Sequence, residues 1–230
     1  MKDSQKSRLQ KAIAESGYCS RRAAEDHIRE GIVTVNDKVA EIGQTVTDDD
    51  EILIDGKPLK SQSKKIYIAL NKPEGYTCTN RFFKGEKNIF DLVDVDERLF
   101  VVGRLDKNSR GLVILTNDGE YTQKMSHPRY HHEKVYEVTI NNKKNLDPKD
   151  ITSVLKKGIT SDGEFLIAKK ASYLGEDTFK IILTEGKKRQ LRRMFGYMDL
   201  RVTDLIRTQI GTVKLGNLKE GEWKEIKNPQ

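Results

Sequence analysis

The feature that most constrains the fold is a change of pattern near residues 61–65. Before it, two short amphipathic stretches precede short β-branched runs; after it, longer apolar runs alternate with polar ones to residue 230. Residues 61–65 are polar and without periodicity, which is typical of a linker. We predict an α+β protein with two domains, residues 1–60 and 66–230, joined by a linker at 61–65.

The first domain has the cap and turn residues of a small α/β unit. Residues 8–16 place apolar side chains on one helical face, and Ser20 is a good N-cap for a second helix over 21–30. Two β-branched runs, 32–35 and 51–54, each end at a two-residue turn signal. The pattern predicts two helices followed by short strands.

The segment from residue 9 to residue 54 resembles the S4 RNA-binding domain in its helix, SRR, second helix, G-x-V-x-V-N and D-x-I order. The resemblance implies recognition of folded RNA by shape. The predicted RNA-binding residues here are Arg8, Lys11, Arg21 and Arg22. Arg21 and Arg22 lie in the first turn of the second helix, where free backbone N–H groups also attract phosphate. On charge alone, an ordinary solvated helical hairpin is the alternative.

From Ile66 onward the sequence predicts mixed strands and helices. Predicted strands are 66–73, 100–106, 111–118, 133–140, 208–215 and 222–226, with a hairpin of 165–174 and 178–186 turning at Gly175. Predicted helices are 119–126, 147–158 and 188–198. No fixed-period repeat occurs, which excludes a solenoid.

Asp106 is the carboxylate best placed for chemistry. It ends the segment Gly103–Asp106 (GRLD), between two apolar strands, where it can be held in a cleft. An aspartate there can act as a nucleophile or a general base. Taken alone, an Asp after a strand is more often a turn or helix cap.

The flanking residues favour the catalytic interpretation. GRLDKNSRGLVILTNDG (103–119) resembles the catalytic motif of the bacterial ribosomal-RNA pseudouridine synthases. That resemblance implies that Asp106 is the essential residue and that Arg104 contacts the displaced RNA. It also implies a catalytic domain with a mixed, largely antiparallel sheet after the S4-like domain. Three further segments match the family in order: NKPEGY (71–76), HPRYHHEKVYEV (127–138) and EGKKRQLRRMF (185–195).

These segments supply the other predicted site residues. Tyr136, in the K-x-Y motif that begins at Lys134, would pack against the target base, and Leu191 would form an apolar wall. We predict that Arg192 pairs with Asp106 and keeps it ionised, because a guanidinium can hold both carboxylate oxygens. Lys188, Arg189 and Arg193 on the last helix are predicted to bind RNA, with a merely solvated basic face as the alternative.

Composition limits the remaining possibilities. The net charge of +7 is compatible with a polyanionic partner, and no apolar run approaches the roughly 20 residues of a membrane span. The charged N-terminus lacks the apolar core of a secretory signal, so we expect a cytoplasmic protein and, from length and charge, a monomer. His127, His131 and His132 have no carboxylate or cysteine companions at ligand spacing, so no metal or other cofactor is expected.

The substrate implied by the resemblance is a uridine in ribosomal RNA, folded within free RNA or a pre-ribosomal particle. The segment from Ala14 to Arg22 resembles the branch that modifies the large subunit, whereas HPRYHHEK resembles the small-subunit branch. We predict large-subunit RNA. Small-subunit RNA, transfer RNA and a non-catalytic RNA-binding assembly factor are the alternatives. The combination of Asp106, Tyr136 and Arg192 argues against the last, because a binding module needs no such set.

Overall fold

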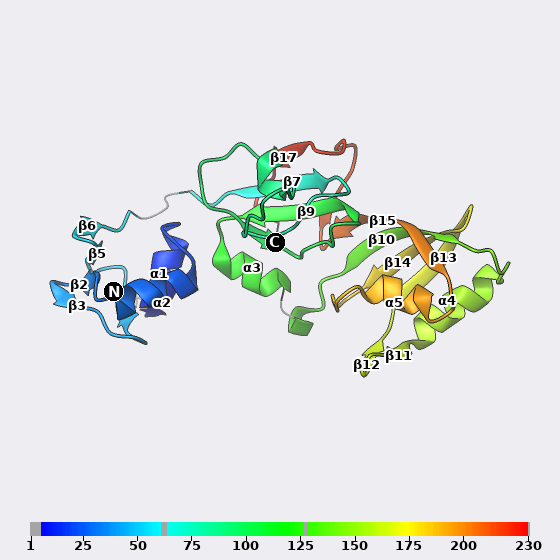
Figure 1. The fold of residues 1–230 in the computed structure, drawn as a ribbon, viewed down its shortest axis with the longest axis horizontal. Coiled ribbons are helices and arrows are strands. Elements are labelled where there is room, and N and C mark those ends of the chain that lie inside the picture. The colour runs from blue at the N-terminus through cyan, green and yellow to red at the C-terminus, as the bar shows by residue number, and fades with distance from the viewer. Residues whose placement is uncertain (1–5, 61–63, 127, 230) are drawn as a thin grey trace. The chain divides into compact units, whose positions relative to one another are not determined.

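The computed structural model describes residues 6–60, 64–126 and 128–229. The chain separates into two compact units, the first built largely from the described residues up to Lys65. Figure 1 shows the helices and strands of both units. Of the predicted linker at 61–65, residues 61–63 lie outside the described residues, and Lys64 and Lys65 belong to no helix or strand.

The N-terminal unit has the predicted helix pair and short strands. Its elements are β1 (Ser7–Arg8), α1 (Leu9–Glu15), α2 (Arg21–Arg29), β2 (Val33–Val35), β3 (Lys38–Val39), β4 (Thr45–Val46), β5 (Ile52–Ile54) and β6 (Lys57–Pro58). Among the described residues, four strands form a sheet in the order β3-β2-β5-β6, and β1 pairs with β4.

Local chemistry explains the boundaries of these elements. The Ser20 side chain accepts a hydrogen bond from the Ala23 N–H at 3.1 Å and caps α2 as predicted. Asn36 and Asp37 both have positive φ, 49° and 63°, which turns β2 tightly into β3. Leu9, Ile13 and Ile28 from the helices pack against the strands to form the core of this unit.

The second unit is built on one large sheet. Its strands are β7 (Tyr67–Lys72), β8 (Phe100–Val102), β9 (Arg110–Thr116), β10 (Lys134–Asn141), β13 (Lys170–Gly175), β14 (Thr178–Leu183), β15 (Arg201–Ile210), β16 (Val213–Lys214) and β17 (Trp223–Glu225). Among the described residues their order is β13-β14-β10-β15-β9-β7-β17, with β16 beside β15 and β8 beside β9. Only the β9–β15 pair among these is parallel, so the sheet is mixed and largely antiparallel, as predicted.

Three α-helices, two 3-10 turns and a separate hairpin flank this sheet in the described residues. They are η1 (Ile89–Leu92), α3 (Gly119–Ser126), η2 (Pro128–Tyr130), α4 (Pro148–Lys157), α5 (Gln190–Gly196), and the hairpin of β11 (Ile159–Ser161) and β12 (Glu164–Leu166). In Figure 1, α4 lies along β13, and α5 lies between β15 and β11. No described helix is long and apolar enough to cross a membrane.

Several predicted elements differ in the structure. The strand predicted at 208–215 is divided by a turn at residues 211–212 between the end of β15 and β16, and residues 103–106 of the strand predicted at 100–106 lie in a loop. The last helix spans Gln190–Gly196 rather than 188–198, because Arg189 and Asp199 adopt left-handed conformations with φ of 51° and 56°. A left-handed residue cannot continue a right-handed helix. The predicted strand 165–174 is split: Phe165 and Leu166 belong to β12, which pairs with β11 across an Asp162–Gly163 turn.

The close approach of β9 to β15 depends on Gly111. Its φ is +105°, and a Cβ there would lie 2.4 Å from the Arg207 carbonyl oxygen and 2.7 Å from the Arg207 nitrogen. We expect Gly111→Ala to lower the free energy of unfolding by about 3 kcal/mol or more, since the backbones must separate. Urea denaturation measures this change. Gly196→Ala is the matched control, because nothing lies within 4 Å of its Cβ position; an equal loss in both variants would contradict the packing argument.

Candidate active site

Asp106 lies in the loop of residues 103–109, between β8 and β9. Its side chain is 42% exposed and lines a cavity of about 780 Å³. Gly103, with φ of +67°, turns the chain out of β8 into this loop. The predicted placement of a carboxylate in a cleft beside a glycine is therefore confirmed.

Two buried cations hold the loop by its main-chain carbonyls. Lys72, fully buried at the end of β7, donates from Nζ to the carbonyls of Pro73 (2.9 Å), Lys107 (3.2 Å) and Ser109 (2.5 Å). These bonds tie the second half of the Asp106 loop to β7, the strand beside the edge strand β17. Because the donor is a charged ammonium group, these bonds are stronger than bonds between neutral groups.

Arg207, on β15 and 1% exposed, holds the first half of the loop. Its Nε donates to the Leu112 carbonyl at 2.8 Å, Nη1 to the Arg104 carbonyl at 3.4 Å, and Nη2 to the Gly103 carbonyl. Main-chain atoms on both sides of Asp106 are thus attached to the sheet. The carboxylate sits on a rigid support, as a positioned catalytic group requires.

Three buried cationic side chains, Lys72, Lys134 and Arg207, lie near Asp106. Burial lowers the pKa of Lys72, and burial together with the neighbouring Arg207 charge lowers the pKa of Lys134. Lys134 is 9% exposed and lies at the start of β10. The combined potential of these cations favours an anionic group in the cavity.

The predicted pairing of Arg192 with Asp106 is wrong in this structure. Arg192 donates from Nη2 to the Asn108 carbonyl and from Nη1 to the Val202 carbonyl at 3.3 Å. The ion pair of Asp106 is instead with Arg189, whose Nη1 lies 3.9 Å from Oδ2. Arg189 reaches the carboxylate because its left-handed conformation puts it ahead of α5, off the helix. Arg192 becomes a third cationic side chain that holds the loop by a carbonyl.

The structure brings most of the predicted site residues to one cavity. Residues that line it together with Asp106 are Arg104, Lys134, Tyr136, Lys188, Arg189, Leu191 and Arg192. Lys134 and Tyr136 are two residues apart on β10 and so lie on one face of the strand. Tyr136 and Leu191 are 7% and 3% exposed, which makes them packed walls of the cavity.

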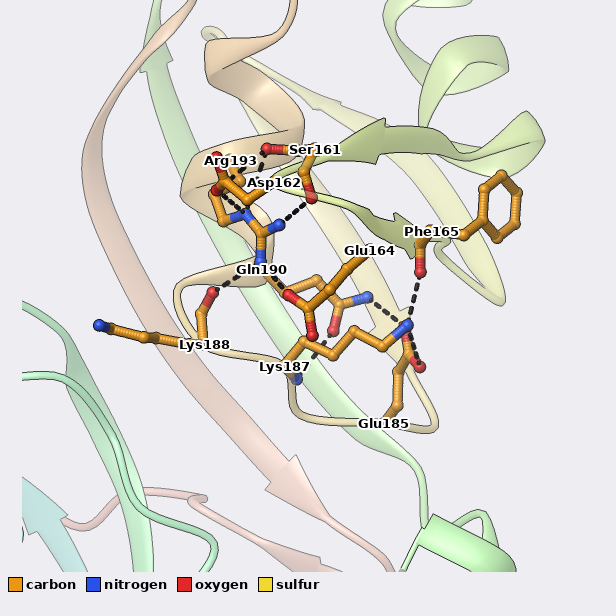
Figure 2. A network of polar contacts seen from close by, with 9 residues as sticks. All are labelled: Ser161, Asp162, Glu164, Phe165, Glu185, Lys187, Lys188, Gln190 and Arg193. Atoms are coloured by element: carbon orange, nitrogen blue, oxygen red, sulfur yellow. Dashed lines mark hydrogen bonds and ion pairs between the residues drawn. The ribbon is translucent and has the colours of Figure 1, made fainter.

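Arg193 lies elsewhere, against the β11–β12 hairpin (Figure 2). Its Nε lies 3.1 Å from Asp162 Oδ2 and its Nη1 2.5 Å from Glu164 Oε2, and Nη2 donates to the Ser161 carbonyl. The side chain is 16% exposed and does not line the cavity. Its contacts attach α5 to the hairpin, so we do not retain Arg193 as an RNA-binding residue.

Figure 2 also shows how the segment before α5 is held. Gln190 is 3% exposed, and its Nε2 donates to Glu185 Oε1 at 2.8 Å and to the Ile167 carbonyl at 3.2 Å. Lys187 Nζ lies 3.2 Å from Glu185 Oε2 and donates to the Phe165 carbonyl. These bonds position the segment that carries Lys188 and Arg189 at the cavity.

Arg193 and Arg189 give a matched pair of substitutions. Arg193→Met is expected to lower the free energy of unfolding by about 1 kcal/mol or more, because a largely buried guanidinium loses its bonds to the Ser161 carbonyl and to the exposed carboxylates of Asp162 and Glu164. Arg189→Met, at a side chain 48% exposed, should leave stability nearly unchanged and weaken RNA binding. Urea denaturation and a filter-binding titration measure the two effects. Equal stability of both variants would contradict the structural role of Arg193.

The predicted RNA-binding residues of the N-terminal unit lie on its surface. Arg21 and Arg22 are exposed in the first turn of α2, as expected. Arg8 is exposed and donates to the Gly43 carbonyl, and Lys11 lies 3.5 Å from Glu15, one helical turn away. Of the three histidines considered as metal ligands, His127 lies outside the described residues.

Lys72 and Arg207 are site residues that sequence reasoning missed. In β15 the inward-facing positions Leu205 and Arg207 are two apart, so a charged residue at a buried position of an alternating strand was the available signal. Lys72 falls inside the NKPEGY segment, at the last position of a strand whose six residues are all buried.

Comparison with known proteins decides the family. The sequence profile described as RNA pseudouridylate synthase matches residues 66–197, more than half of the chain. The chain belongs to this family. A second profile, described as S4 domain, matches residues 7–52. The resemblance inferred from both sets of motifs is therefore confirmed, and so is the order of an S4 domain followed by a pseudouridine synthase domain.

Relatives of this pseudouridine synthase span almost its whole length. An RNA pseudouridine synthase of Aquifex aeolicus is 41% identical over 95% of this chain and 90% of its own length. Ribosomal large subunit pseudouridine synthase B of Bacillus subtilis is 36% identical over 95% and 91%. The dual-specificity RNA pseudouridine synthase RluF of Escherichia coli K12 is 38% identical over 95% and 75%.

A solved pseudouridylate synthase structure has the same fold. It superposes with a TM-score of 0.68 at 31% identity and covers 96% of both chains. The synthase fold and the isomerase class predicted from sequence agree with this likeness and with the relatives.

Proposed function

We propose that this pseudouridine synthase isomerises a uridine in the RNA of the large ribosomal subunit, with Asp106 as the catalytic carboxylate. The observation that carries the proposal is that Asp106, Tyr136 and Leu191 line one cavity, with Asp106 on a loop held by buried cations. Large-subunit RNA is favoured by the likeness to the B. subtilis large-subunit synthase along nearly the full length of both chains.

The reaction needs a carboxylate at the junction of sugar and base. The bond between uracil N1 and C1′ breaks, the base turns, and C5 bonds to C1′ while the C5 proton leaves and N1 gains one. Atoms and electrons balance within the nucleoside, so no cofactor is consumed. Asp106 acts at this junction as nucleophile or base, and its firm support keeps it in register with the ribose.

The cavity walls would keep the detached uracil from escaping. The Tyr136 ring offers a flat face for stacking, and Leu191 offers an apolar wall; together they hold the base while it turns. Lys134 at the cavity wall stabilises the negative charge of the detached uracil. Arg104, exposed at the mouth, braces the RNA from which the uridine is displaced. Arg192 acts as a positioning residue for the loop rather than on substrate.

RNA would be held by basic residues in both domains. Residues 1–60 form the S4-like clamp that uses Arg8, Lys11, Arg21 and Arg22, residues 61–65 the linker, and residues 66–230 the catalytic domain with Lys188 and Arg189 at its cavity. The enzyme works as a monomer in the cytoplasm, where ribosomal RNA is available as free RNA or in a pre-ribosomal particle.

Mapping pseudouridines in total RNA from cells with and without this protein tests the proposal. One uridine of large-subunit RNA is expected to lose its modification in the deletion strain and regain it when the wild-type gene is returned. A site found only in small-subunit RNA or transfer RNA would overturn the substrate assignment. An unchanged map in all RNA would favour a non-catalytic RNA-binding factor instead.

A further inference from the structure

Beside the cavity, residues 79–87 form a loop whose tip carries two exposed phenylalanines. Phe82 is 67% exposed and Phe83 53% exposed. Single exposed apolar residues are common on proteins, but two consecutive aromatic side chains, each more than half exposed, concentrate apolar surface at one loop tip, and clustered apolar surface marks interaction sites.

Hydrogen bonds join the two ends of the loop. Asn88, 1% exposed, donates from Nδ2 to the carbonyls of Thr79 (2.8 Å) and Arg81 (3.2 Å). The Thr77 N–H and hydroxyl both donate to the Lys87 carbonyl, at 2.9 and 3.1 Å. The aromatic tip is therefore presented on a fixed base, which lowers the entropy lost when a ligand binds.

The charges of the loop favour RNA over an apolar protein partner. Arg81, Lys84 and Lys87 are exposed in the same loop, and Lys87 Nζ lies over the Tyr76 ring, 5.5 Å from its centre. The acidic side chain of Glu86 lies 3.1 Å from Lys107 Nζ, so that lysine offsets its charge. Aromatic rings interleaved with cations are the pattern that binds unpaired nucleotides, with bases stacked on the rings and phosphates on the cations.

The base of the loop belongs to the active-site cavity. Thr77, Cys78 and Thr79 line that cavity together with Asp106, and the Glu86–Lys107 ion pair joins the loop to the residue after Asp106. An RNA strand that delivers a uridine to Asp106 therefore passes the loop.

We propose that Phe82 and Phe83 stack on a nucleobase that neighbours the displaced uridine and hold the strand open beside it. The proposal rests on the proposed function for the presence of RNA in the cavity. Phenylalanine offers no hydrogen bond to a base edge, so the contact is tolerant of sequence and serves to keep the neighbouring base unpaired.

Fluorescence of an RNA probe tests this contact. The probe is a mixed-sequence stem-loop with a loop uridine and 2-aminopurine on one or the other side of it, and the protein carries Asp106→Asn so that no turnover occurs. Binding should quench 2-aminopurine by stacking. Phe82→Ala/Phe83→Ala should abolish the quench and weaken binding about 10-fold or more, whereas Phe82→Tyr/Phe83→Tyr, which retains both rings, should preserve both signals.

Tyr197→Ala is the matched control, because Tyr197 is 64% exposed and lies outside the cavity lining. Circular dichroism checks that each variant is folded. Binding of the alanine pair within about twofold of the parent with the quench intact would overturn the inference, as would an equal loss for Tyr197→Ala. Quenching and affinity report RNA binding and do not require turnover. A wild-type protein that converts no uridine would therefore count against the proposed function alone and not against the role of the loop.

Discussion

Asp106→Asn is expected to reduce the single-turnover rate of pseudouridine formation by at least about 10³-fold. Asparagine keeps the size of the side chain but cannot act as nucleophile or base. The loop should keep its place, because Lys72 and Arg207 hold its carbonyls and not the Asp106 side chain. Release of tritium from RNA labelled at uracil C5 measures the rate, since the C5 proton must leave.

The control for this substitution is Asp94→Asn, at another exposed carboxylate outside the cavity. It should leave the rate unchanged, and both variants should bind RNA and unfold as the wild type does. An Asp106→Asn protein that turned over at the wild-type rate would remove Asp106 from the reaction. A loss of folding in that variant would instead show that the carboxylate supports the loop.

Arg207→Met is expected to lower the free energy of unfolding by about 3 kcal/mol or more. Methionine roughly fills the volume but leaves the buried Leu112 carbonyl and the partly buried carbonyls of Gly103 and Arg104 without that donor. The rate at saturating RNA should also fall, by about 10²-fold, because the Asp106 loop is no longer held in register. Urea denaturation and single-turnover kinetics measure the two effects.

Arg201→Met on the same strand is the matched control, since Arg201 is exposed. It should cost less than about 0.5 kcal/mol. A stable Arg207→Met protein with a normal rate would show that the loop needs no such support. Together with Asp106→Asn, which should impair chemistry without loss of stability, this variant separates the reacting group from the residues that position it.

Elements set by local chemistry could be predicted from the sequence. The Ser20 cap, the Asn36–Asp37 turn and the Asp147 cap of α4 each act through atoms two or three residues away, so the residues themselves specify them. The alternating and helical apolar patterns likewise placed β7, β9 and β10. The Asp162–Gly163 turn is an equally local signal, but the strands beside it are only three residues long, which is too short for an alternating pattern to predict them.

The start of α5 could not be predicted from helical periodicity. The pattern continues through Lys188 and Arg189, but the Gln190 side chain is drawn into the contacts with Glu185 and Ile167 that fix the preceding turn. Tertiary hydrogen bonds therefore override a favourable local pattern. The consequence reaches the active site, because Arg189 rather than Arg192 ends beside Asp106.

The sequence by itself determined the family and the two kinds of domain and pointed to Asp106 as the proposed catalytic carboxylate, because contiguous motifs carry each of these. What only the tertiary structure decided is how that carboxylate is held. Arg207 lies about one hundred residues along the chain from the carbonyls of Gly103 and Arg104. Strand pairing brings these groups together, and buried carbonyls must find donors wherever the fold supplies them, so no local pattern encodes the match.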